Sequence, residues 1–198
     1  MIIIGLTGPS GSGKGWVSAI LKEHNIPAID TDAVYHDLLI PPSPCLYELC
    51  SAFGNSILQN GQLNRAALAA IVFSDKTKLA TLNKITHKYI LNKTDDLLSE
   101  FEEQGYRAAI VDAPALYEAA YDKKCDFVIA VIAPRQLRLK RIMKRDNITE
   151  EAAQRRISAQ HPDEFYSSKA KYTVVNDNNE ERLSNDLNNI LCAEGLLP

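Results

Sequence analysis

The stretch that decides the fold of this sequence is Gly8-Pro9-Ser10-Gly11-Ser12-Gly13-Lys14, which fits the pattern G-x-x-x-x-G-K. It follows Ile2–Thr7, a short apolar run rich in β-branched residues that predicts a buried strand. It precedes Lys14–His24, where apolar residues recur at the spacing of one helical face. A strand, a glycine-rich turn and a helix in this order predict a phosphate-binding loop, because backbone N–H groups and the helix dipole converge on the anion. Lys14 is expected to reach the β- and γ-phosphates of a nucleotide.

The residue that follows the lysine departs from this pattern. Ser or Thr normally stands there and ligates Mg²⁺ through its hydroxyl, whereas this chain has Gly15. Phosphate binding is expected to survive the change, but a bound metal loses one ligand. A water molecule could replace that ligand, or Ser18 could help indirectly from one helical turn further on.

Strand patterns and helix patterns alternate along most of the chain. After the first strand, we expect strands at 27–29, 106–111, 127–132 and 173–175. Helices are expected to begin near Ala115, Pro134 and Thr149, and a last helix runs up to Gly195. This alternation predicts an α/β fold of the P-loop NTPase type, with a parallel sheet of about five strands between two layers of helices.

We expect residues 1–198 to form a single P-loop domain that carries an insertion. Helical periodicity dominates residues 45–104, with a turn at Asn60-Gly61. That block is too long for a simple crossover, so residues 40–104 are predicted to form an inserted helical lobe.

Composition limits the class of protein. The 198 residues are 45% hydrophobic and 24% charged, as in globular domains, and no apolar run approaches the roughly 20 residues of a membrane span. A net charge of −3 argues against a general nucleic-acid binder. With no signal peptide and four scattered cysteines, we expect a soluble cytoplasmic protein with reduced thiols. Residues 135–156 hold eight basic and three acidic residues, a cationic island that suits a nucleotide, although a solvated helix face is the alternative.

Carboxylates follow two of the expected strands. Asp112 ends the strand at 106–111, where a carboxylate can face the loop and orient Mg²⁺ or its water shell; an ordinary strand-terminal aspartate is the alternative. Asp30-Thr31-Asp32 follows the strand at 27–29. Asp32 is the better candidate for the base in phosphoryl transfer and Asp30 the lesser one, while helix capping is the alternative for Asp32.

Further motifs recur in a fixed order after the phosphate loop. They are Asp30–Asp32, Asn60–Leu68, Leu82–His87, Pro114–Glu118, Arg141–Asp146 and Arg156–Gln160. The dephospho-coenzyme A kinase family carries its motifs in the same order, and the chain resembles that family nearly end to end. The pattern Asn92-Lys93-Thr94-Asp95, by contrast, lies inside a helical stretch, and so we reject a guanine-reading GTPase.

The resemblance implies a reaction, its substrates and their sites. It implies transfer of the γ-phosphoryl group of ATP to the ribose 3′-hydroxyl of dephospho-CoA, the last step of coenzyme A biosynthesis, with Mg²⁺. Asp32 would take the proton, and Arg65 and His87 in the helical lobe would help to seat the acceptor. The remaining site residues implied are, for ATP, Gly8 to Gly15, Arg145 and Arg156. For catalysis they are Lys14, Arg141 and Arg145, and near the acceptor they are Asp112, Pro114 and Glu118. A lid region at 135–170 would close over the site, and the protein would be a monomer or weak homo-oligomer that binds neither nucleic acid nor membranes.

Some positions depart from the family pattern and leave alternatives open. Lys88 replaces a proline, Ala115 replaces a leucine, and the late signature appears only in part at Lys171–Asn179, a region that can contribute to the adenine pocket. One alternative is another nucleoside- or nucleotide-type P-loop kinase. The other is an ATP-binding homologue whose catalysis is weakened because Gly15 replaces the usual hydroxyl residue.

Overall fold

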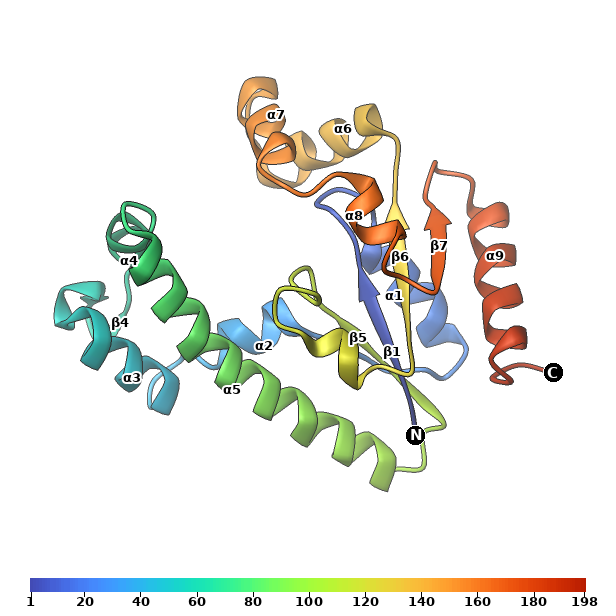
Figure 1. The fold of residues 1–198 in the computed structure, drawn as a ribbon, viewed down its shortest axis with the longest axis horizontal. Helices are drawn as coiled ribbons and strands as arrows, with labels where there is room; N and C mark the ends of the chain where they lie inside the picture. Colours follow the sequence, from blue (N-terminus) through green and yellow to red (C-terminus); the bar gives the residue numbers. More distant parts are fainter. The chain divides into compact units, whose positions relative to one another are not determined.

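The computed structural model describes residues 1–198 and contains one main sheet. Its strands are β1 (Ile2–Thr7), β2 (Ala28–Asp30), β5 (Ala108–Asp112), β6 (Phe127–Ile132) and β7 (Tyr172–Val175). The order across the sheet is β2-β5-β1-β6-β7; β1 runs parallel to β5 and β6, and β6 runs parallel to β7 (Figure 1). The predicted α/β fold with a five-stranded, mostly parallel sheet is confirmed.

The central strand β1 places the glycine-rich loop at the middle of the sheet. Its neighbours are β5 on one side and β6 on the other, and the register pairs Leu6 with Asp112 and Thr7 with Ala130. The loop leaves β1 directly after these pairs. In open α/β sheets, ligands bind at the carboxyl ends of the strands where the strand order switches direction, and this loop lies at such a point.

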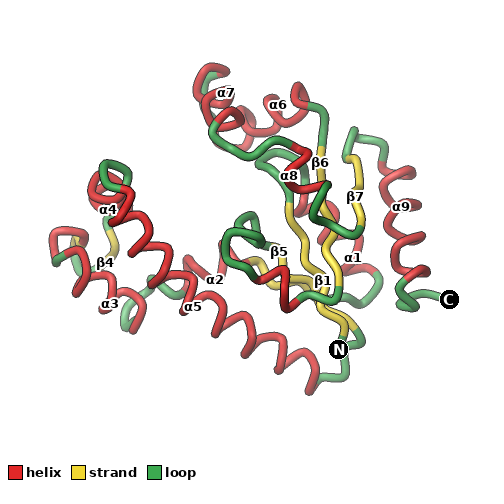
Figure 2. Tube along the Cα trace, in the orientation of Figure 1, coloured by secondary structure: helices red, strands yellow, loops and turns green.

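Helices α1 (Lys14–Glu23) and α9 (Glu180–Ala193) pack on one face of the sheet. Val17 and Leu21 of α1 and Leu187 of α9 are fully buried against Ile4 and Ile129 of the strands. The chain after β6 forms α6 (Arg135–Asp146), α7 (Glu150–Ser158) and the short α8 (Asp163–Ser167), as the helix colouring of Figure 2 shows. This packing fixes α1 to the sheet at the end of the loop.

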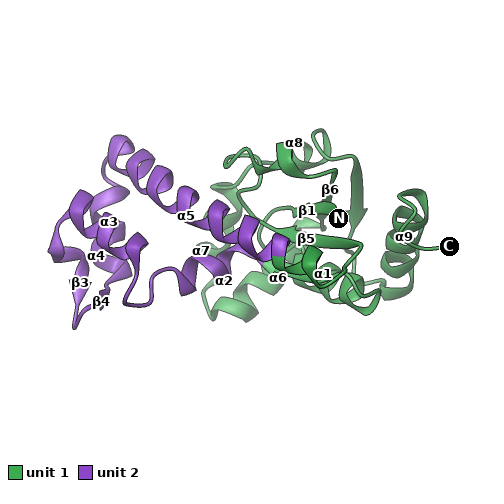
Figure 3. Cartoon of the chain, turned by 90° about the horizontal axis from the view of Figure 1, so that it is seen from below, with its two compact units in different colours: residues 1–29, 100–198 green, residues 30–99 purple.

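The chain divides into two compact units, residues 1–29 with 100–198 and residues 30–99, which Figure 3 colours separately. The second unit contains α2 (Thr31–Asp37), α3 (Pro44–Phe53), the 3₁₀ turn η1 (Asn55–Ile57), β3 (Leu58–Gln59), β4 (Gln62–Leu63), α4 (Arg65–Val72) and most of α5 (Lys76–Glu103). It has its own apolar core, with Leu49, Ile57 and Leu68 at its centre. No helix is long and apolar enough to cross a membrane.

Two local predictions need correction. The helix expected near Ala115 is absent, since residues 114–120 form turns that end at Ala120, with φ 54°, before the 3₁₀ turn η2 (Tyr121–Lys124). Leu116 and Tyr121 are both buried, and the Tyr121 N–H reaches the Leu116 carbonyl at 3.0 Å, a five-residue closure that a regular α-helix does not make. In the second unit, the Asn60-Gly61 turn joins the two-residue strands β3 and β4, which are too short to give an alternating pattern.

Candidate phosphate-binding site

At three positions, Gly8, Gly11 and Gly13, the loop has a backbone that glycine alone accommodates, and Gly8 and Gly13 are the most crowded. Gly8 and Gly13 have φ of 145° and 91°, in the region that side chains rarely adopt. A Cβ on Gly8 would lie 2.1 Å from the Val131 carbonyl oxygen, and one on Gly13 would lie 2.1 Å from Asn176 Nδ2. Gly15 differs, because nothing lies within 4 Å of its Cβ position. A side chain therefore fits at residue 15, and packing does not explain the glycine there.

Lys14 folds back over this loop from the start of α1. Its Nζ donates to the Gly8 carbonyl at 3.1 Å, so the ammonium group lies across the loop. The Gly13 carbonyl accepts from the N–H of Trp16 at 3.0 Å, so α1 begins directly at the end of the loop. The first N–H groups of the helix are therefore next to the loop. Ser12 is fully buried, and its hydroxyl has no hydrogen-bond partner within the protein. Together these groups offer donors and positive charge to an anion.

Asp112 and Ser18 meet beside the loop. Asp112 closes β5, and its Oδ2 accepts a hydrogen bond from Ser18 Oγ at 3.3 Å. Mg²⁺ in kinase sites is held by one or two carboxylates together with waters and substrate phosphates. The Asp112 carboxylate and the Ser18 hydroxyl supply oxygen donors of that kind, so the residues present fit the metal even though Gly15 contributes none.

The predicted arginines of α6 contact the loop. Arg141 NH1 donates to the carbonyls of Gly11 and Ser12, both at 3.1 Å, and its NH2 donates to Asn176 Oδ1 at 2.8 Å. Partial burial lowers the pKa of the Arg141 guanidinium from its usual value. Arg141, on α6, thus connects the loop backbone to Asn176, which follows β7. Contact of residues 172–179 with adenine stays a prediction.

Arg145 and Arg156 share a carboxylate. Arg145 NH2 donates to Ser10 Oγ at 3.2 Å, and its Nε pairs with Asp146 Oδ1 at 2.8 Å. Arg156 pairs with the other oxygen of Asp146 and makes no direct contact with the loop. The two guanidinium groups, Arg145 first, hold the pKa of the Asp146 carboxyl below its usual range. Action of either arginine on phosphate stays a prediction.

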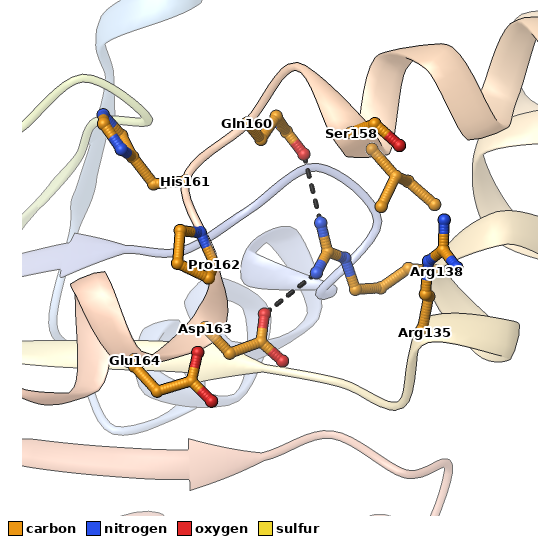
Figure 4. Close-up of a pocket in the computed structure, with 9 residues that line it drawn as sticks. Arg135, Arg138, Ser158, Gln160, His161, Pro162, Asp163 and Glu164 are labelled. Carbon is orange, nitrogen blue, oxygen red and sulfur yellow. Dashed lines mark hydrogen bonds and ion pairs between the residues drawn. The ribbon is translucent and has the colours of Figure 1, made fainter.

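Arg138 is a site residue that the sequence analysis missed. Its side chain is only 5% exposed, and Nε donates to the Ser10 carbonyl at 3.1 Å. NH1 pairs with Asp163 Oδ1 at 2.9 Å, and NH2 donates to Gln160 Oε1 at 3.1 Å (Figure 4). Gln160 Oε1 also accepts the N–H of Ser10 at 3.1 Å. Both backbone groups of Ser10 are therefore held by Arg138 and Gln160. These two residues also line a pocket of about 380 Å³ formed by α6, the end of α7 and the start of α8.

The signal for these residues was present but ambiguous. Arg138 is one of eight basic residues in 135–156, and nothing in the sequence distinguishes a buried arginine from its solvated neighbours. Gln160 is the last residue of the motif Arg156–Gln160, for which the sequence predicts no role of the glutamine. Asn176 stands in the partly matching late signature, and its buried Nδ2 has no partner in the protein. Only the tertiary packing of α6, α8 and β7 brings the three to the loop.

Replacing Arg138 with Met is expected to raise the KM for ATP about tenfold and to destabilise the fold by about 2 kcal/mol. The change leaves the Asp163 carboxylate without its arginine and the Ser10 carbonyl without its donor, and Gln160 Oε1 keeps only the Ser10 N–H. Steady-state kinetics and thermal denaturation measure the two effects. Arg135→Ala is the matched control, since Arg135 is exposed on the same helix and lines the same pocket. Equal KM values in both variants would contradict a positioning role for Arg138.

The unit of residues 30–99 carries the predicted acceptor residues on three helices. Asp30 is the N-cap of α2, since its Oδ1 accepts from the N–H groups of Asp32 and Ala33 at 2.9 and 3.1 Å. The Asp32 carboxylate takes no part in that cap. Arg65 opens α4, and His87 is half-buried on α5. The capping alternative for Asp32 is therefore wrong.

One departure from the family pattern and two predicted residues have structural partners. Lys88 Nζ pairs with Glu48 Oε2 at 2.5 Å, and Tyr89 donates to the same oxygen at 2.8 Å, which ties α5 to α3. The Pro114 carbonyl accepts from Thr7 Oγ1 at 3.5 Å. Glu118 lies 3.4 Å from His161 Nε2. Substrate contact by Pro114 or Glu118 stays a prediction.

The rejected GTPase pattern lies inside a helix. Residues 92–95 belong to α5, and Thr94 is fully buried with its hydroxyl donating to the Ile90 carbonyl at 2.8 Å. A base-reading motif needs exposed side chains at the end of a strand. The rejection agrees with this placement.

Known proteins similar to this chain were identified by sequence and by structure. A family model described as dephospho-CoA kinase matches residues 2–182. The chain is 38% identical to a dephospho-CoA kinase of Corynebacterium glutamicum over 184 residues, 92% of each chain. It is 42% identical to that of Moorella thermoacetica over 162 residues, which are 81% of this chain and 76% of the relative.

Solved structures give the same family and a wider fold relationship. A Thermus thermophilus protein of known crystal structure has a TM-score of 0.82 at 30% identity, covering 97% of both chains. Dephospho-CoA kinase from Campylobacter jejuni has a TM-score of 0.69 at 26% identity, covering 98% of both. Shikimate kinase from Bacteroides thetaiotaomicron, at a TM-score of 0.57 and 12% identity, shares the fold alone.

Proposed function

The chain belongs to the dephospho-CoA kinase family, and from this premise we propose that it transfers the γ-phosphoryl group of ATP to the ribose 3′-hydroxyl of dephospho-CoA. The resemblance drawn from the order of motifs is confirmed, and the protein is a kinase of coenzyme A biosynthesis. The observation that carries the finer proposal is the glycine loop with Lys14 folded across it, at the carboxyl end of β1. That arrangement supports binding of a nucleotide polyphosphate.

The roles we assign follow from charge and contact. Lys14 and the N–H groups at the start of α1 would hold the β- and γ-phosphates, and Arg141 would keep the loop backbone in register through its bonds to Gly11 and Ser12. Arg145, bonded to Ser10, would add positive charge as the phosphoryl group moves. Asp32 would accept the proton of the acceptor hydroxyl. Closure of residues 135–170 over the site would exclude water.

Asp112 and Ser18 are the residues that would hold Mg²⁺. Bound there, the ion would neutralise charge on the transferred phosphoryl group. Their oxygens are joined by a 3.3 Å hydrogen bond, which orients the Asp112 carboxylate toward α1.

The direct test is ATP-dependent formation of CoA from dephospho-CoA, followed by chromatography, with adenosine and AMP as competing acceptors. A kcat/KM for dephospho-CoA at least about 100-fold above the others supports the proposal. Preference for another acceptor would favour a nucleoside- or nucleotide-type kinase instead. ATP binding without turnover of any acceptor would favour the weakened homologue that Gly15 suggests.

Gly15→Ser is expected to lower the Mg²⁺ concentration for half-maximal turnover about three- to tenfold. The site has room for the side chain, and the new hydroxyl would restore the oxygen that the loop pattern normally supplies. A magnesium titration of turnover measures the effect. Gly15→Ala is the matched control, because alanine raises helix propensity without adding an oxygen. If Ser and Ala shift the titration equally, the effect belongs to the helix and not to the metal.

A further inference from the structure

Helix α6 ends on a residue that the helix itself does not favour. Its last residue is Asp146, and Asn147 follows in the left-handed conformation, with φ 50°. A negative charge in the last turn opposes the helix dipole, whose C-terminal end is already negative. The basic residues Lys144 and Arg145 in the same turn carry the charge that suits this end. The reason for an aspartate at 146 therefore lies outside the helix.

The Asp146 carboxylate holds two arginines from different helices. Arg145 binds it side-on, with Nε 2.8 Å from Oδ1 and NH2 3.0 Å from Oδ2. Arg156 of α7 donates to Oδ2 through NH1. The Asp146 side chain is only 20% exposed, whereas the side chains of Arg145 and Arg156 are 58% and 47% exposed. The carboxylate is thus enclosed, and the guanidinium groups around it remain accessible.

The other two acidic residues of the basic segment 135–156 stabilise α7 instead. Glu150 and Glu151 lie in the first turn of α7, where negative charge is favourable. Glu150 Oε1 accepts from Gln154 Nε2 at 3.0 Å. Hydrogen bonds from its own N–H and from Thr149 lower the pKa of the Glu151 carboxyl. Of the three carboxylates, Asp146 is the one that bridges two arginines.

The bridged arginines are connected to the phosphate loop. Arg145 NH2 also donates to Ser10 Oγ at 3.2 Å, so the contacts run from Ser10 through Arg145 and Asp146 to Arg156. Two guanidinium groups at one place repel each other, and a carboxylate between them offsets that repulsion. The group of two arginines and one aspartate keeps a net charge of +1. Positive charge is therefore concentrated beside the loop at a lower electrostatic cost.

We propose that Asp146 is a positioning residue for phosphoryl transfer: it aligns the Arg145 guanidinium with the phosphate loop and keeps Arg156 beside it. The inference rests on the proposed function, because it names what holds the arginines of that same reaction. Asp146 does not bind the phosphates, since like charges repel. It acts through the arginines, and the side-on pairing fixes the plane of the Arg145 guanidinium before ATP binds. A carboxylate that competed with phosphate for these arginines would have the opposite effect, because its removal would tighten ATP binding.

Asp146→Asn is expected to lower kcat for CoA formation about 30-fold and to weaken ATP binding about fivefold, with the KM for dephospho-CoA within about twofold. The amide keeps the shape of the side chain but has one acceptor oxygen and no charge, so it cannot hold both arginines. Asp146→Glu keeps the charge and should restore kcat to within about fivefold of the parent. Asp186→Asn is the matched control, since this carboxylate lies 3.9 Å from the exposed Arg182 on α9. It should keep the parental kcat.

A variant without both arginines separates positioning from a structural role. In the Arg145→Ala, Arg156→Ala background, adding Asp146→Asn should change kcat by less than about twofold, because nothing is left for the carboxylate to position. A further loss close to 30-fold in that background would show that Asp146 acts elsewhere and would overturn the proposal. An unchanged kcat in the single variant Asp146→Asn would overturn it as well.

Calorimetric titration of ATP distinguishes failure of this proposal from failure of the proposed function. If the parent protein does not phosphorylate dephospho-CoA, the proposed function fails, and the ATP affinities of the parent, Asp146→Asn and Asp146→Glu still decide the role of Asp146. A fivefold weaker affinity in Asp146→Asn that Asp146→Glu restores supports the assignment. An unchanged or tighter affinity in Asp146→Asn refutes it, and a parent that does not bind ATP refutes both proposals.

Discussion

Replacing Lys14 with Ala is expected to lower kcat for CoA formation about 10³-fold. The Lys14 ammonium lies across the glycine loop, 3.1 Å from the Gly8 carbonyl. Removing one preorganised positive group from a phosphoryl-transfer site costs a factor of that size, because charge develops there in the transition state. Quenched-flow or steady-state turnover at saturating ATP measures the change.

The fold should tolerate this substitution. Alanine is the better helix former at the first residue of α1, and Lys14 contributes nothing to the apolar core beneath it. Lys22→Ala, at the exposed end of the same helix, is the matched control and should keep full turnover. A Lys14→Ala enzyme with more than a tenth of parental kcat would show that the phosphates are held by other groups.

The parts of this fold that the sequence predicted are those with strong local signals. The strand of Ile2–Thr7, the glycine loop and the helix from Lys14 adjoin one another, so their patterns report one contiguous structure. Asp112 could be predicted because a strand of apolar residues ends at it. Each of these signals depends on spacing within a few residues.

The parts that were missed depend on packing between distant segments. Arg138 is buried because α8 brings Asp163 to it, 25 residues further along the chain. The helix expected at Ala115 stops after one turn, because Ala120 takes a left-handed conformation with φ 54° and the Tyr121 N–H then bonds back to the Leu116 carbonyl. The pairing of His36 with Arg65 joins residues 29 positions apart, and neither residue stood out for it. No periodicity within a single element encodes such contacts.

Replacing Asp32 with Asn is expected to lower kcat about 10²- to 10⁴-fold and to leave the stability nearly unchanged. The amide keeps the shape of the side chain but cannot accept the proton of the acceptor hydroxyl. Because Asp30 and not Asp32 caps α2, the helix does not depend on the charge at 32. Single-turnover measurement of CoA formation isolates the chemical step from release of products.

The neighbouring Asp30 is expected to affect stability and not turnover, and its replacement therefore tests the assignment of Asp32 as the base. Asp30→Ala removes the acceptor of two N–H groups at 2.9 and 3.1 Å and should destabilise the unit of residues 30–99 by about 1 kcal/mol. Its kcat should fall no more than several-fold, since the carboxylate at 32 remains. The two variants should therefore differ in opposite ways: Asp30→Ala loses stability and keeps most of its single-turnover rate, whereas Asp32→Asn loses that rate and keeps its stability. If Asp30→Ala loses turnover and Asp32→Asn keeps it, the base is Asp30, and the capping bonds belong only to the ligand-free state.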